Sequence, residues 1–327
     1  MAGSVLVTGG AGYIGSHAVL ELLDQGRRPV VLDDLSTGDR AAVPAEVALY
    51  EGSVADSGLV ARVLRDEGVA AVMHFAASIS APESVADPAK YYRNNTCASL
   101  SLATSCVETR APILFIFSSS AAVYGEPDVS PVPEEAAARP INPYGASKRM
   151  TEIMLADMAL AHPSFRPLCL RYFNVAGADP EGRAGPRNPK GSNLIPQAVA
   201  AALGRRDALD ICGDDYDTRD GTGERDYIHV SDLAAAHVAA LDYLQRGGAE
   251  LVINCGYGRG VTVLEVVSAL EKLTGRPLPV RRAPRRPGDA ASAVSDVRRL
   301  RSALDWRPRH DDLGAILGSA LAWQERL

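Results

Sequence analysis

The chain has 327 residues, of which 46% are hydrophobic and 23% charged, so it is long enough for one large or two modest domains. This composition excludes a disordered or fibrous protein. The 40 acidic residues outnumber the 34 basic ones, and the net charge of -6 argues against a protein that coats nucleic acid. No segment approaches the roughly 20 apolar residues of a membrane span, and the N-terminus has no basic signal region. We therefore expect a cytoplasmic protein without a membrane or nucleic-acid partner.

Five cysteines are scattered through the sequence without a C-x-x-C pair: Cys97, Cys106, Cys169, Cys212 and Cys255. Their odd number and spacing predict buried reduced thiols rather than disulfides or a zinc site. Three histidines in apolar settings have no partner at metal-ligand spacing: His74, His229 and His237. We expect these histidines in or near the core, and we predict no metal site.

Short β-branched apolar runs alternate with longer helical patterns through the first half of the chain. The expected strands are 5–10, 29–34, 47–52, 70–77, 112–120 and 167–174, and the expected helices are 15–25, 56–67, 85–109 and 143–161. Apolar strands separated by helices are typical of a parallel sheet that helices cover on both faces. The sequence therefore predicts an α/β fold with a Rossmann-like, doubly wound parallel sheet.

The composition changes over residues 179–192, where glycine, proline and charged residues predominate. Such a stretch predicts a long surface loop that opens a second, smaller α/β region. We place the first domain at 1–172 and the second at 173–327, and we expect 226–256 to return to the first sheet. Later helices are expected at 231–244 and 262–273, and later strands at 251–256 and 278–283.

Three glycines follow the first expected strand in the turn TGGAGYIG, at Gly9, Gly12 and Gly15. Glycine permits the tight turn from strand to helix and lets the backbone approach a pyrophosphate, which N–H groups at the start of the helix can bind. The next strand ends in Asp33, whose carboxylate is placed to accept hydrogen bonds from the ribose hydroxyls of an adenosine. Because a carboxylate repels a 2′-phosphate, the pattern favours NAD over NADP.

A tyrosine and a lysine four residues apart lie in the segment NPYGASK, on one face of a helix expected to begin at Pro143. Tyr144 and Lys148 follow an apolar strand that ends in three serines, Ser118 to Ser120. A phenol near its reference pKa of about 10 is a poor base at neutral pH. We expect the ammonium of Lys148 and a positive nicotinamide ring to lower the pKa of Tyr144, so that Tyr144 can accept a proton.

The sequence as a whole resembles the UDP-galactose (UDP-glucose) 4-epimerases among the extended short-chain dehydrogenases/reductases. The resemblance runs from end to end and includes VLVTGGAGYIGSH, LDDLSTG, FSSSAAVYGEP, NPYGASK, LRYFNVAGADP, DGTGERDYIHVSDLAAAH and APRRPGD. It implies that NAD is the cofactor, that a UDP-sugar is the substrate and that the second region is the nucleotide-sugar-binding domain. It also implies a homodimer, which a bundle of the helices expected at 85–109 and 143–161 would join.

The resemblance implies three catalytic residues: Ser120, which would bind the sugar 4-hydroxyl, Tyr144, which would accept its proton, and Lys148. The residues that would bind the cofactor are Gly9, Gly12, Tyr13, Ile14, Gly15, Asp33, Asp34, Leu35, Ser36, Thr37, Gly38, Ser53, Val54, Phe75, Ala76, Ala77, Ile79, Asn94, Ser118, Tyr144, Lys148 and Phe173. Those that would bind the nucleotide sugar are Ser120, Tyr144, Asn174, Asn193, Leu194, Arg225, Arg286, Asp289 and Ala293. Guanidinium groups suit the diphosphate, since they bind phosphate oxygens bidentately.

Ala121 and Ala122 stand where related nucleotide-sugar dehydratases carry Asp or Glu. Those enzymes need an acid and a base to eliminate water after oxidation at C4 of the sugar, and two alanines supply neither. The resemblance therefore implies a 4-epimerase that interconverts UDP-glucose and UDP-galactose through a transient 4-keto sugar. Two other classes stay open: a net NAD-dependent oxidoreductase, and a sensor that binds dinucleotide without catalysis.

Three features depart from the common pattern of the family. Ile79 stands where many relatives carry a lysine, so one charged cofactor contact is absent. Ala293 stands where a tyrosine often closes the pocket beside the sugar C2 substituent, and the smaller side chain would admit UDP-N-acetylglucosamine. The loop with Arg183, Arg187 and Lys190 is more basic than in many relatives, and an arginine that reached the sugar C6 would favour UDP-glucuronate. UDP-xylose is a further alternative substrate.

Overall fold

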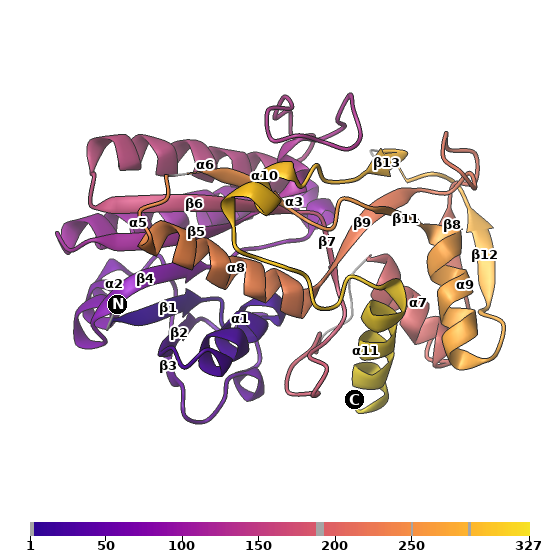
Figure 1. Ribbon diagram of the computed structural model, residues 1–327, viewed down its shortest axis with the longest axis horizontal. Coiled ribbons are helices and arrows are strands. Elements are labelled where there is room, and N and C mark those ends of the chain that lie inside the picture. Colours follow the sequence, from indigo (N-terminus) through magenta and orange to yellow (C-terminus); the bar gives the residue numbers. More distant parts are fainter. Residues whose placement is uncertain (1–2, 188–192, 250, 287–288) are drawn as a thin grey trace.

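A seven-stranded parallel sheet forms the centre of the computed structural model, which describes residues 3–187, 193–249, 251–286 and 289–327 (Figure 1). Its order is β10-β6-β5-β4-β1-β2-β3, so the direction of winding reverses between β1 and β4. The strands are β1 (Ser4–Thr8), β2 (Pro29–Asp33), β3 (Ala48–Glu51), β4 (Val69–His74), β5 (Ile113–Ser120), β6 (Phe165–Tyr172) and β10 (Val252–Cys255). This is the strand order of a Rossmann-like doubly wound sheet, and the predicted fold class is confirmed.

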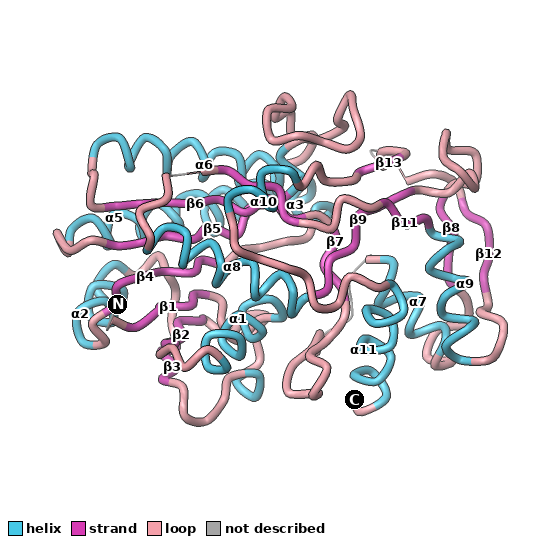
Figure 2. Tube along the Cα trace, viewed as in Figure 1, coloured by secondary structure: helices cyan, strands magenta, loops and turns pink. Residues whose placement is uncertain are grey.

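Helices cover both faces of the sheet, because its strands are apolar on both faces (Figure 2). In β1, for example, Val5 and Val7 belong to one core cluster and Leu6 to the other. The first cluster includes side chains of α1 (Tyr13–Asp24) and α8 (Val230–Gln245), and the second includes side chains of α2 (Ser57–Asp66), α5 (Ala98–Glu108) and α6 (Pro143–Ala161). The helix predicted over 143–161 matches α6.

A smaller region follows the large sheet along the chain. It holds a sheet in which β7 (Asn174–Ala176), β11 (Gly260–Thr262) and β13 (Ser292–Ala293) all pair with β9 (Glu224–His229), and a pair formed by β8 (Leu209–Cys212) and β12 (Val280–Ala283). Its helices are α7 (Leu194–Ala202), α9 (Val263–Thr274), α10 (Arg298–Ala303) and α11 (Leu313–Glu325). Within the segment 226–256, α8 and β10 lie on the large sheet, whereas β9 belongs to the smaller one. The predicted domain boundaries remain predictions.

The single helix predicted over 85–109 is wrong. The structure has instead α3 (Ala81–Ala86), α4 (Pro88–Tyr91), a π-helical segment η2 (Tyr92–Cys97) and α5. Asp87 adopts non-helical backbone angles because it precedes a proline, and its carboxylate caps α4 by accepting a hydrogen bond from the N–H of Lys90 at 3.1 Å.

The cysteine prediction is correct for three of the five thiols. All five are free, and Cys106, Cys169 and Cys255 are buried. Cys212 is half-buried at the end of β8, and Cys97 is exposed, because it ends the π-helical segment at the surface. For these two residues the prediction of a buried thiol is wrong.

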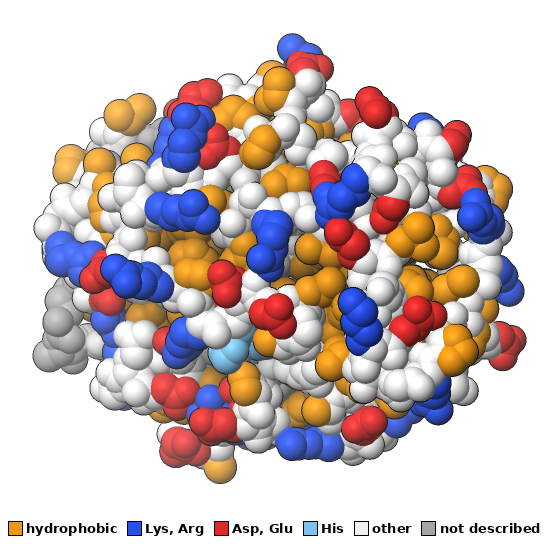
Figure 3. Space-filling model, turned by 45° about the vertical axis from the view of Figure 1, so that its right-hand side comes forward, with side chains coloured by type: hydrophobic (Ala, Val, Ile, Leu, Met, Phe, Trp, Pro, Cys, Tyr) orange, Lys and Arg blue, Asp and Glu red, His pale blue; other side chains and the backbone are white. Residues whose placement is uncertain are grey.

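Charged side chains of both signs are interspersed over the face of the molecule in Figure 3, with apolar side chains between them. In the part of the chain that the structure describes, no helix combines the length and the apolar character of a bilayer span. Among the same residues, no group of three His, Cys, Asp or Glu side chains could hold a metal ion. The three histidines predicted in or near the core are buried, as expected: His74, His229 and His237.

Candidate active site

The predicted cofactor residues gather at one edge of the large sheet, where the parallel strands have their carboxyl ends. They follow β1, β2, β3, β4, β5 and β6, on both sides of the point where the strand order reverses. Ligands of open α/β sheets bind at this edge, next to the reversal.

The glycine loop after β1 leaves no room for side chains. A Cβ on Gly9, whose φ is +70°, would lie 2.6 Å from the amide nitrogen of Ala76, and a Cβ on Gly15 would lie 2.1 Å from the carbonyl oxygen of Gly9. Gly12 is the N-cap of α1, and no side chain caps this helix end. The first N–H groups of α1 therefore face a close-packed backbone turn, as phosphate binding requires.

Tyr13 and Ile14 open α1. The hydroxyl of Tyr13 donates a hydrogen bond to the carbonyl oxygen of Gly177 at 2.6 Å, and burial raises the pKa of this phenol. Ile14 packs against the first core cluster. Because Gly177 follows β7, the contact of Tyr13 joins the glycine loop to the smaller region of the chain.

The carboxylate of Asp33 lies beside the glycine loop at the end of β2. It accepts hydrogen bonds from the N–H groups of Ala11 and Leu35, each at 2.9 Å. Burial raises the pKa of this carboxyl, and the two backbone donors lower it in part. A Cβ on Gly38 would lie 2.9 Å from Oδ1 of Asp33. The loop is thus built closely around a carboxylate whose orientation the backbone sets.

The remaining cofactor candidates differ in how far they are buried. Val54 and Phe173 pack against core clusters, and the ring of Phe75 lies 4.7 Å from that of His237. Ala76 and Ala77 follow Phe75 and are half-buried. The exposed candidates are Asp34, Ser36, Thr37, Ser53 and Ile79.

The π-helical segment η2 carries the predicted cofactor residue Asn94. Its Nδ2 donates to Oγ of Ser78 at 3.0 Å, and the next residue, Asn95, accepts from the N–H of Ser78 at 2.8 Å. Asn95 also donates to Oγ of Ser147 on α6 at 3.0 Å. Segments of π-helix are frequent at functional sites, and this one joins the loop after β4 to α6.

Ser120, Tyr144 and Lys148 meet at the end of β5. Ser120 is the last residue of this strand, and its side chain lies close enough to the hydroxyl of Tyr144 to lower the pKa of that phenol. The Nζ of Lys148 donates to the carbonyl oxygen of Ser118 at 2.8 Å and lies 4.9 Å from the centre of the Phe117 ring. The structure therefore brings together the three residues predicted to be catalytic.

Local sequence explains how α6 begins at this point. Asn142 is the N-cap, and its Oδ1 accepts a hydrogen bond from the N–H of Gly145 at 2.9 Å, while Pro143 occupies the first turn. A Cβ on Gly145 would lie 2.3 Å from the carbonyl oxygen of Ala122. Glycine thus lets the short helix η3 (Ala121–Val123), which follows Ser120, lie against the first turn of α6.

Burial dominates the electrostatics of the pair. It raises the pKa of Tyr144, and the hydrogen bond with Ser120 lowers that pKa only in part. Burial also lowers the pKa of Lys148 to about 8, although the negative charge of Glu152 raises it in part. In the protein alone the loss of water around a phenolate therefore outweighs the favourable contacts, and the acidification of Tyr144 by Lys148 and a nicotinamide ring together stays a prediction.

Five residues predicted to bind the nucleotide sugar lie together in the smaller region. Asn174 is on β7, Arg225 on β9 and Ala293 on β13, and Ala293 pairs directly with Arg225. An η nitrogen of Arg225 lies 3.5 Å from a carboxylate oxygen of Asp289, whose N–H donates to the carbonyl oxygen of Arg286 at 3.2 Å. Two other candidates, Asn193 and Leu194, lie outside this sheet at the start of α7.

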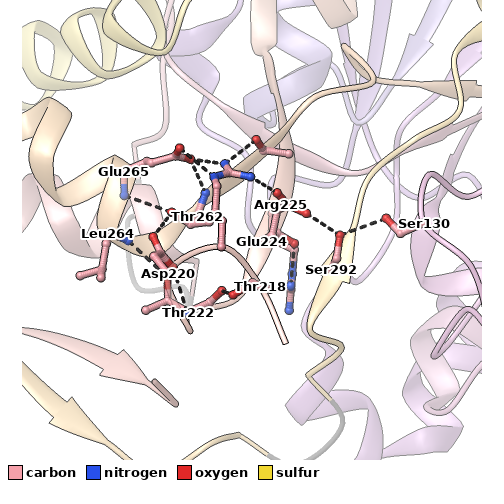
Figure 4. Close-up of polar contacts among 12 residues, drawn as sticks. Ser130, Thr218, Asp220, Thr222, Glu224, Arg225, Thr262, Leu264, Glu265 and Ser292 are labelled. Atoms are coloured by element: carbon pink, nitrogen blue, oxygen red, sulfur yellow. Dashed lines mark hydrogen bonds and ion pairs between the residues drawn. The ribbon is translucent and has the colours of Figure 1, made fainter. Parts of the chain in front are cut away.

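Polar contacts hold the strand that carries Arg225 (Figure 4). The adjacent Glu224 accepts hydrogen bonds from Arg219 and from the hydroxyl of Ser292, the latter at 2.7 Å. The same hydroxyl lies 3.0 Å from that of Ser130, in the loop that follows β5. The contacts join the strands of the smaller region to the part of the chain that carries Ser120.

The two described basic residues of the loop predicted to reach a uronate, Arg183 and Arg187, bind acidic side chains of the protein itself. Arg183 binds Asp24 at 2.8 Å and Asp179 at 2.9 Å, and Arg187 lies 3.2 Å from Asp39. Acidic groups thus already neutralise both arginines, so the predicted contact with a uronate loses its support for these two residues. Lys190, the third basic residue of that prediction, lies outside the described residues.

A buried polar network behind the catalytic residues was missed in the sequence. Glu152 on α6 binds Arg171 on β6 through two hydrogen bonds, at 2.8 and 2.6 Å, and accepts a third from Ser119 at 2.6 Å. Arg171 also donates to the hydroxyl of Tyr124 at 2.9 Å. An arginine in the apolar run LCLRYF was the available signal, since a charge in a buried strand requires a partner.

Comparison with known proteins agrees with this geometry. Residues 5–256 match the model of the NAD dependent epimerase/dehydratase family. The chain is 56% identical over 324 residues to a UDP-glucose 4-epimerase of Azospirillum brasilense, covering 99% of this chain and 92% of that protein.

Two solved structures are similar over nearly the whole chain. A UDP-glucose 4-epimerase of Brucella ovis in complex with NAD has a TM-score of 0.94 and 45% identity, over 98% of each chain. The UDP-Glc/GlcNAc 4-epimerase of Campylobacter jejuni has a TM-score of 0.87 and 44% identity, over 99% of this chain and 100% of that one. The chain therefore belongs to the NAD dependent epimerase/dehydratase family and, within it, to the UDP-glucose 4-epimerase family.

Proposed function

We propose that this protein is an NAD-dependent 4-epimerase that interconverts UDP-glucose and UDP-galactose. One observation carries the proposal: Tyr144 lies beside Ser120, Lys148 donates a hydrogen bond to the same strand end, and the next two residues are alanines. The site thus has a proton acceptor for a sugar hydroxyl but no carboxylate at the two positions where a dehydratase would need one. Family membership supports the same reading.

The residues at the edge of the large sheet fit NAD. Side chains at Gly9 and Gly15 would collide with neighbouring backbone, the start of α1 has no side-chain cap, and Asp33 holds a carboxylate beside the loop. We propose that α1 binds the pyrophosphate, that Asp33 binds the adenosine ribose and that Lys148 binds the nicotinamide ribose. NAD, when bound, supplies a reversible acceptor for two electrons. Its positive ring would also stabilise the phenolate and so lower the pKa of Tyr144, which burial raises in the protein alone.

The reaction of the protein's own groups follows from their positions. Ser120 would orient the sugar 4-hydroxyl, and Tyr144 would accept its proton while C4 is oxidised. After the 4-keto sugar has turned, Tyr144 would return the proton to the same oxygen as C4 is reduced by hydride on its opposite face. Because the sugar must turn between these steps, the binding energy has to lie on the uridine diphosphate rather than on the hexose. Arg225 and the neighbouring residues of the smaller region are placed to provide that anchor.

A second substrate is favoured by one residue. Ala293 pairs with Arg225 in the smaller sheet, and its methyl side chain takes less room than the tyrosine that often stands at this position in the family. We propose that UDP-N-acetylglucosamine is also accepted, as the similarity to the Campylobacter jejuni UDP-Glc/GlcNAc 4-epimerase supports. UDP-glucuronate has lost the support of Arg183 and Arg187, and no residue of the site singles out UDP-xylose.

We also propose that the protein is a cytoplasmic homodimer. Several apolar side chains on helices near the active site are exposed: Val85 on α3, Leu100 on α5, and Met150, Ile153 and Leu160 on α6. Burying such groups favours association through these helices. Sedimentation velocity would test the dimer, and an Ile153→Glu variant should shift the protein towards monomer.

The experiment for the function is product analysis. The purified protein is incubated separately with UDP-glucose, UDP-N-acetylglucosamine, UDP-glucuronate and UDP-xylose, and the products are resolved by chromatography while NADH absorbance is followed. Formation of the 4-epimer without net NADH supports the proposal. Net NADH formation would assign the protein to the oxidoreductases, and binding without any product would make it a sensor.

A further inference from the structure

Glu152 is a buried carboxylate for which the proposed reaction has no direct use. Only 3% of its surface is exposed. Its oxygens accept hydrogen bonds from the hydroxyl of Ser119 at 2.6 Å and from the guanidinium of Arg171 at 2.8 and 2.6 Å, and Arg149 lies 3.1 Å away. Three elements, α6, β5 and β6, are thereby joined at one carboxylate.

The residue that Glu152 holds on β5 lies between two residues of the active site. Ser119 separates Ser118, whose carbonyl oxygen accepts a hydrogen bond from Lys148, from Ser120, whose side chain lies next to the hydroxyl of Tyr144. On α6, Glu152 is four residues after Lys148 and therefore one helical turn away on the same face. Both ends of the catalytic arrangement, the strand end and the helix, are thus attached to the same buried group.

We propose that Glu152 is a positioning residue for the epimerase reaction: it ties Ser119 to α6 and supplies the negative charge that keeps the buried Lys148 an ammonium. The inference rests on the proposed function, since it assigns Glu152 a task within that site. Among the described residues, the hydrogen bonds and ion pairs of Glu152 go to Ser119, Arg149 and Arg171, and none goes to Tyr144 or to a residue proposed to bind the sugar.

The charges around Lys148 support this task. Burial lowers the pKa of Lys148 to about 8, and Glu152 opposes the shift. Other titratable or charged groups on elements packed around this site include His74 of β4, Tyr144 and Arg149 of α6, and Cys169, Arg171 and Tyr172 of β6. On α3 and α4, which also pack against α6, the carboxylate of Glu83 is bonded to Lys90 at 2.6 Å and Tyr91 at 2.8 Å. Glu152 is the carboxylate whose charge raises the pKa of Lys148. Its removal would leave the charge of Arg171 uncompensated and lower the pKa of Lys148 further.

A purely structural role would give a different result. The same network contains Tyr124, whose hydroxyl accepts a hydrogen bond from Arg171 at 2.9 Å and donates one to Asn254 at 2.7 Å. A Tyr124→Phe variant removes buried hydrogen bonds without changing charge or touching Ser119. It is the matched control, expected to lower the melting temperature and to leave the titration of Lys148 unchanged.

The experiment measures the titration of Lys148 directly. The chain has only four lysines, Lys90, Lys148, Lys190 and Lys272, so NMR of the NAD-saturated protein with labelled lysine side chains resolves few signals, and a Lys148→Met variant assigns the one in question. In Glu152→Gln we expect Lys148 to titrate about one pH unit lower than in the parent. In Glu152→Asp, which restores the charge, we expect the parent titration. An unchanged titration in Glu152→Gln would overturn the electrostatic part of the proposal.

Kinetics test the tie to β5. In Glu152→Gln and Ser119→Ala we expect kcat to fall about 10-fold to 100-fold, with the KM for UDP-glucose within about threefold of the parent, because only the alignment of the reacting groups changes. Ser119→Ala keeps the ion pair and the charge, so it remains informative if Glu152→Gln does not fold. A parent-like kcat in a folded Ser119→Ala variant would overturn the proposal that the hydrogen bond between Glu152 and Ser119 aligns the end of β5. Because the NMR titration needs no substrate, its outcome is independent of whether the protein is an epimerase.

Discussion

The ammonium of Lys148 is bound to the backbone of β5, since its Nζ lies 2.8 Å from the carbonyl oxygen of Ser118. The same strand ends two residues later at Ser120, whose side chain lies next to the hydroxyl of Tyr144. Helix α6 and strand β5 are therefore joined at two neighbouring points. A movement of either element would change both the proton acceptor and the cation next to it.

Turnover is expected to fall as the pH rises through about 8, because the pKa of Lys148 is lowered to about 8. The ammonium is present below this pH and is lost above it, and with it the positive charge that holds the strand end and favours a phenolate. The measurement is kcat from neutral to strongly alkaline pH, with circular dichroism at each pH to show that the fold persists. Constant turnover well above this pH in a folded protein would contradict the prediction.

Asp33→Asn is expected to weaken NAD binding about 10-fold to 100-fold, the usual effect of losing a hydrogen bond to a charged group. Because the variant no longer repels a 2′-phosphate, NADP should bind more tightly than it does to the parent. Calorimetric titration of both dinucleotides measures the two changes. Asp66→Asn, which alters an exposed carboxylate on α2, is the control and should change neither. A parent-like preference for NAD in Asp33→Asn would refute the assignment.

Ala293→Tyr is expected to discriminate between substrates. The larger side chain would fill the space beside Arg225 that we assign to an N-acetyl group, so kcat/KM for UDP-N-acetylglucosamine should fall about 100-fold relative to UDP-glucose. Ala293→Gly, which only enlarges the space, should retain both activities. An equal loss of both activities in Ala293→Tyr would show that this position supports the fold rather than the sugar.

Acid is expected to destabilise the protein through its buried histidines. Burial lowers the pKa of His17 and His237 to about 4 and that of His74 and His229 to about 3, from an ordinary value of 6.5. Between these values the unfolded chain binds protons that the folded chain does not, so the free energy of unfolding declines as the pH falls below 6.5. Each histidine contributes about 1.4 kcal/mol per pH unit at most, and the raised pKa of the Asp226 carboxyl acts in the opposite direction above its ordinary value of 3.8.

Urea unfolding at a series of pH values measures this slope. His237→Leu should reduce it by the share of one histidine, since the Nε2 of His237 is buried without a hydrogen-bond partner among the described residues. His162→Gln at the surface is the control and should leave the slope unchanged. A free energy of unfolding that stays constant as the pH falls towards 4 would contradict the account.

Sequence reasoning predicted the architecture well, because it depends on patterns that are local in the chain. The glycines of TGGAGYIG, the acid at the end of β2 and the pair in NPYGASK each carry their own spacing, and the parallel sheet brings them to one edge. The predicted helix over 85–109 is interrupted at Asp87, where α4 begins with Pro88. The pattern of helix-forming residues around this proline hides the interruption, and Pro88 after Asp87 is the signal in the sequence for a new helix.

Long-range charge pairing could not be predicted in the same way. Whether Arg183 reaches a sugar or an acid depends on Asp24, which lies 159 positions away in the sequence. The direction of the pKa shift of Tyr144 depends on burial by the whole site, which no spacing within NPYGASK reveals. The partnership of Glu152 with Ser119 and Arg171 likewise appears only when α6 packs against β5 and β6.

The central claim is that the phenol of Tyr144 carries the proton in the reaction, and turnover by Tyr144→Phe tests it most directly. The variant keeps the ring and its packing, so it should fold and still bind NAD and UDP-glucose. The control Tyr50→Phe, which removes a hydroxyl bonded to Glu67 instead, should keep the parental kcat. We predict that kcat falls by roughly 10²-fold to 10⁴-fold, the usual contribution of a general acid–base group. A folded Tyr144→Phe protein that interconverts UDP-glucose and UDP-galactose at a near-parental rate would contradict the account.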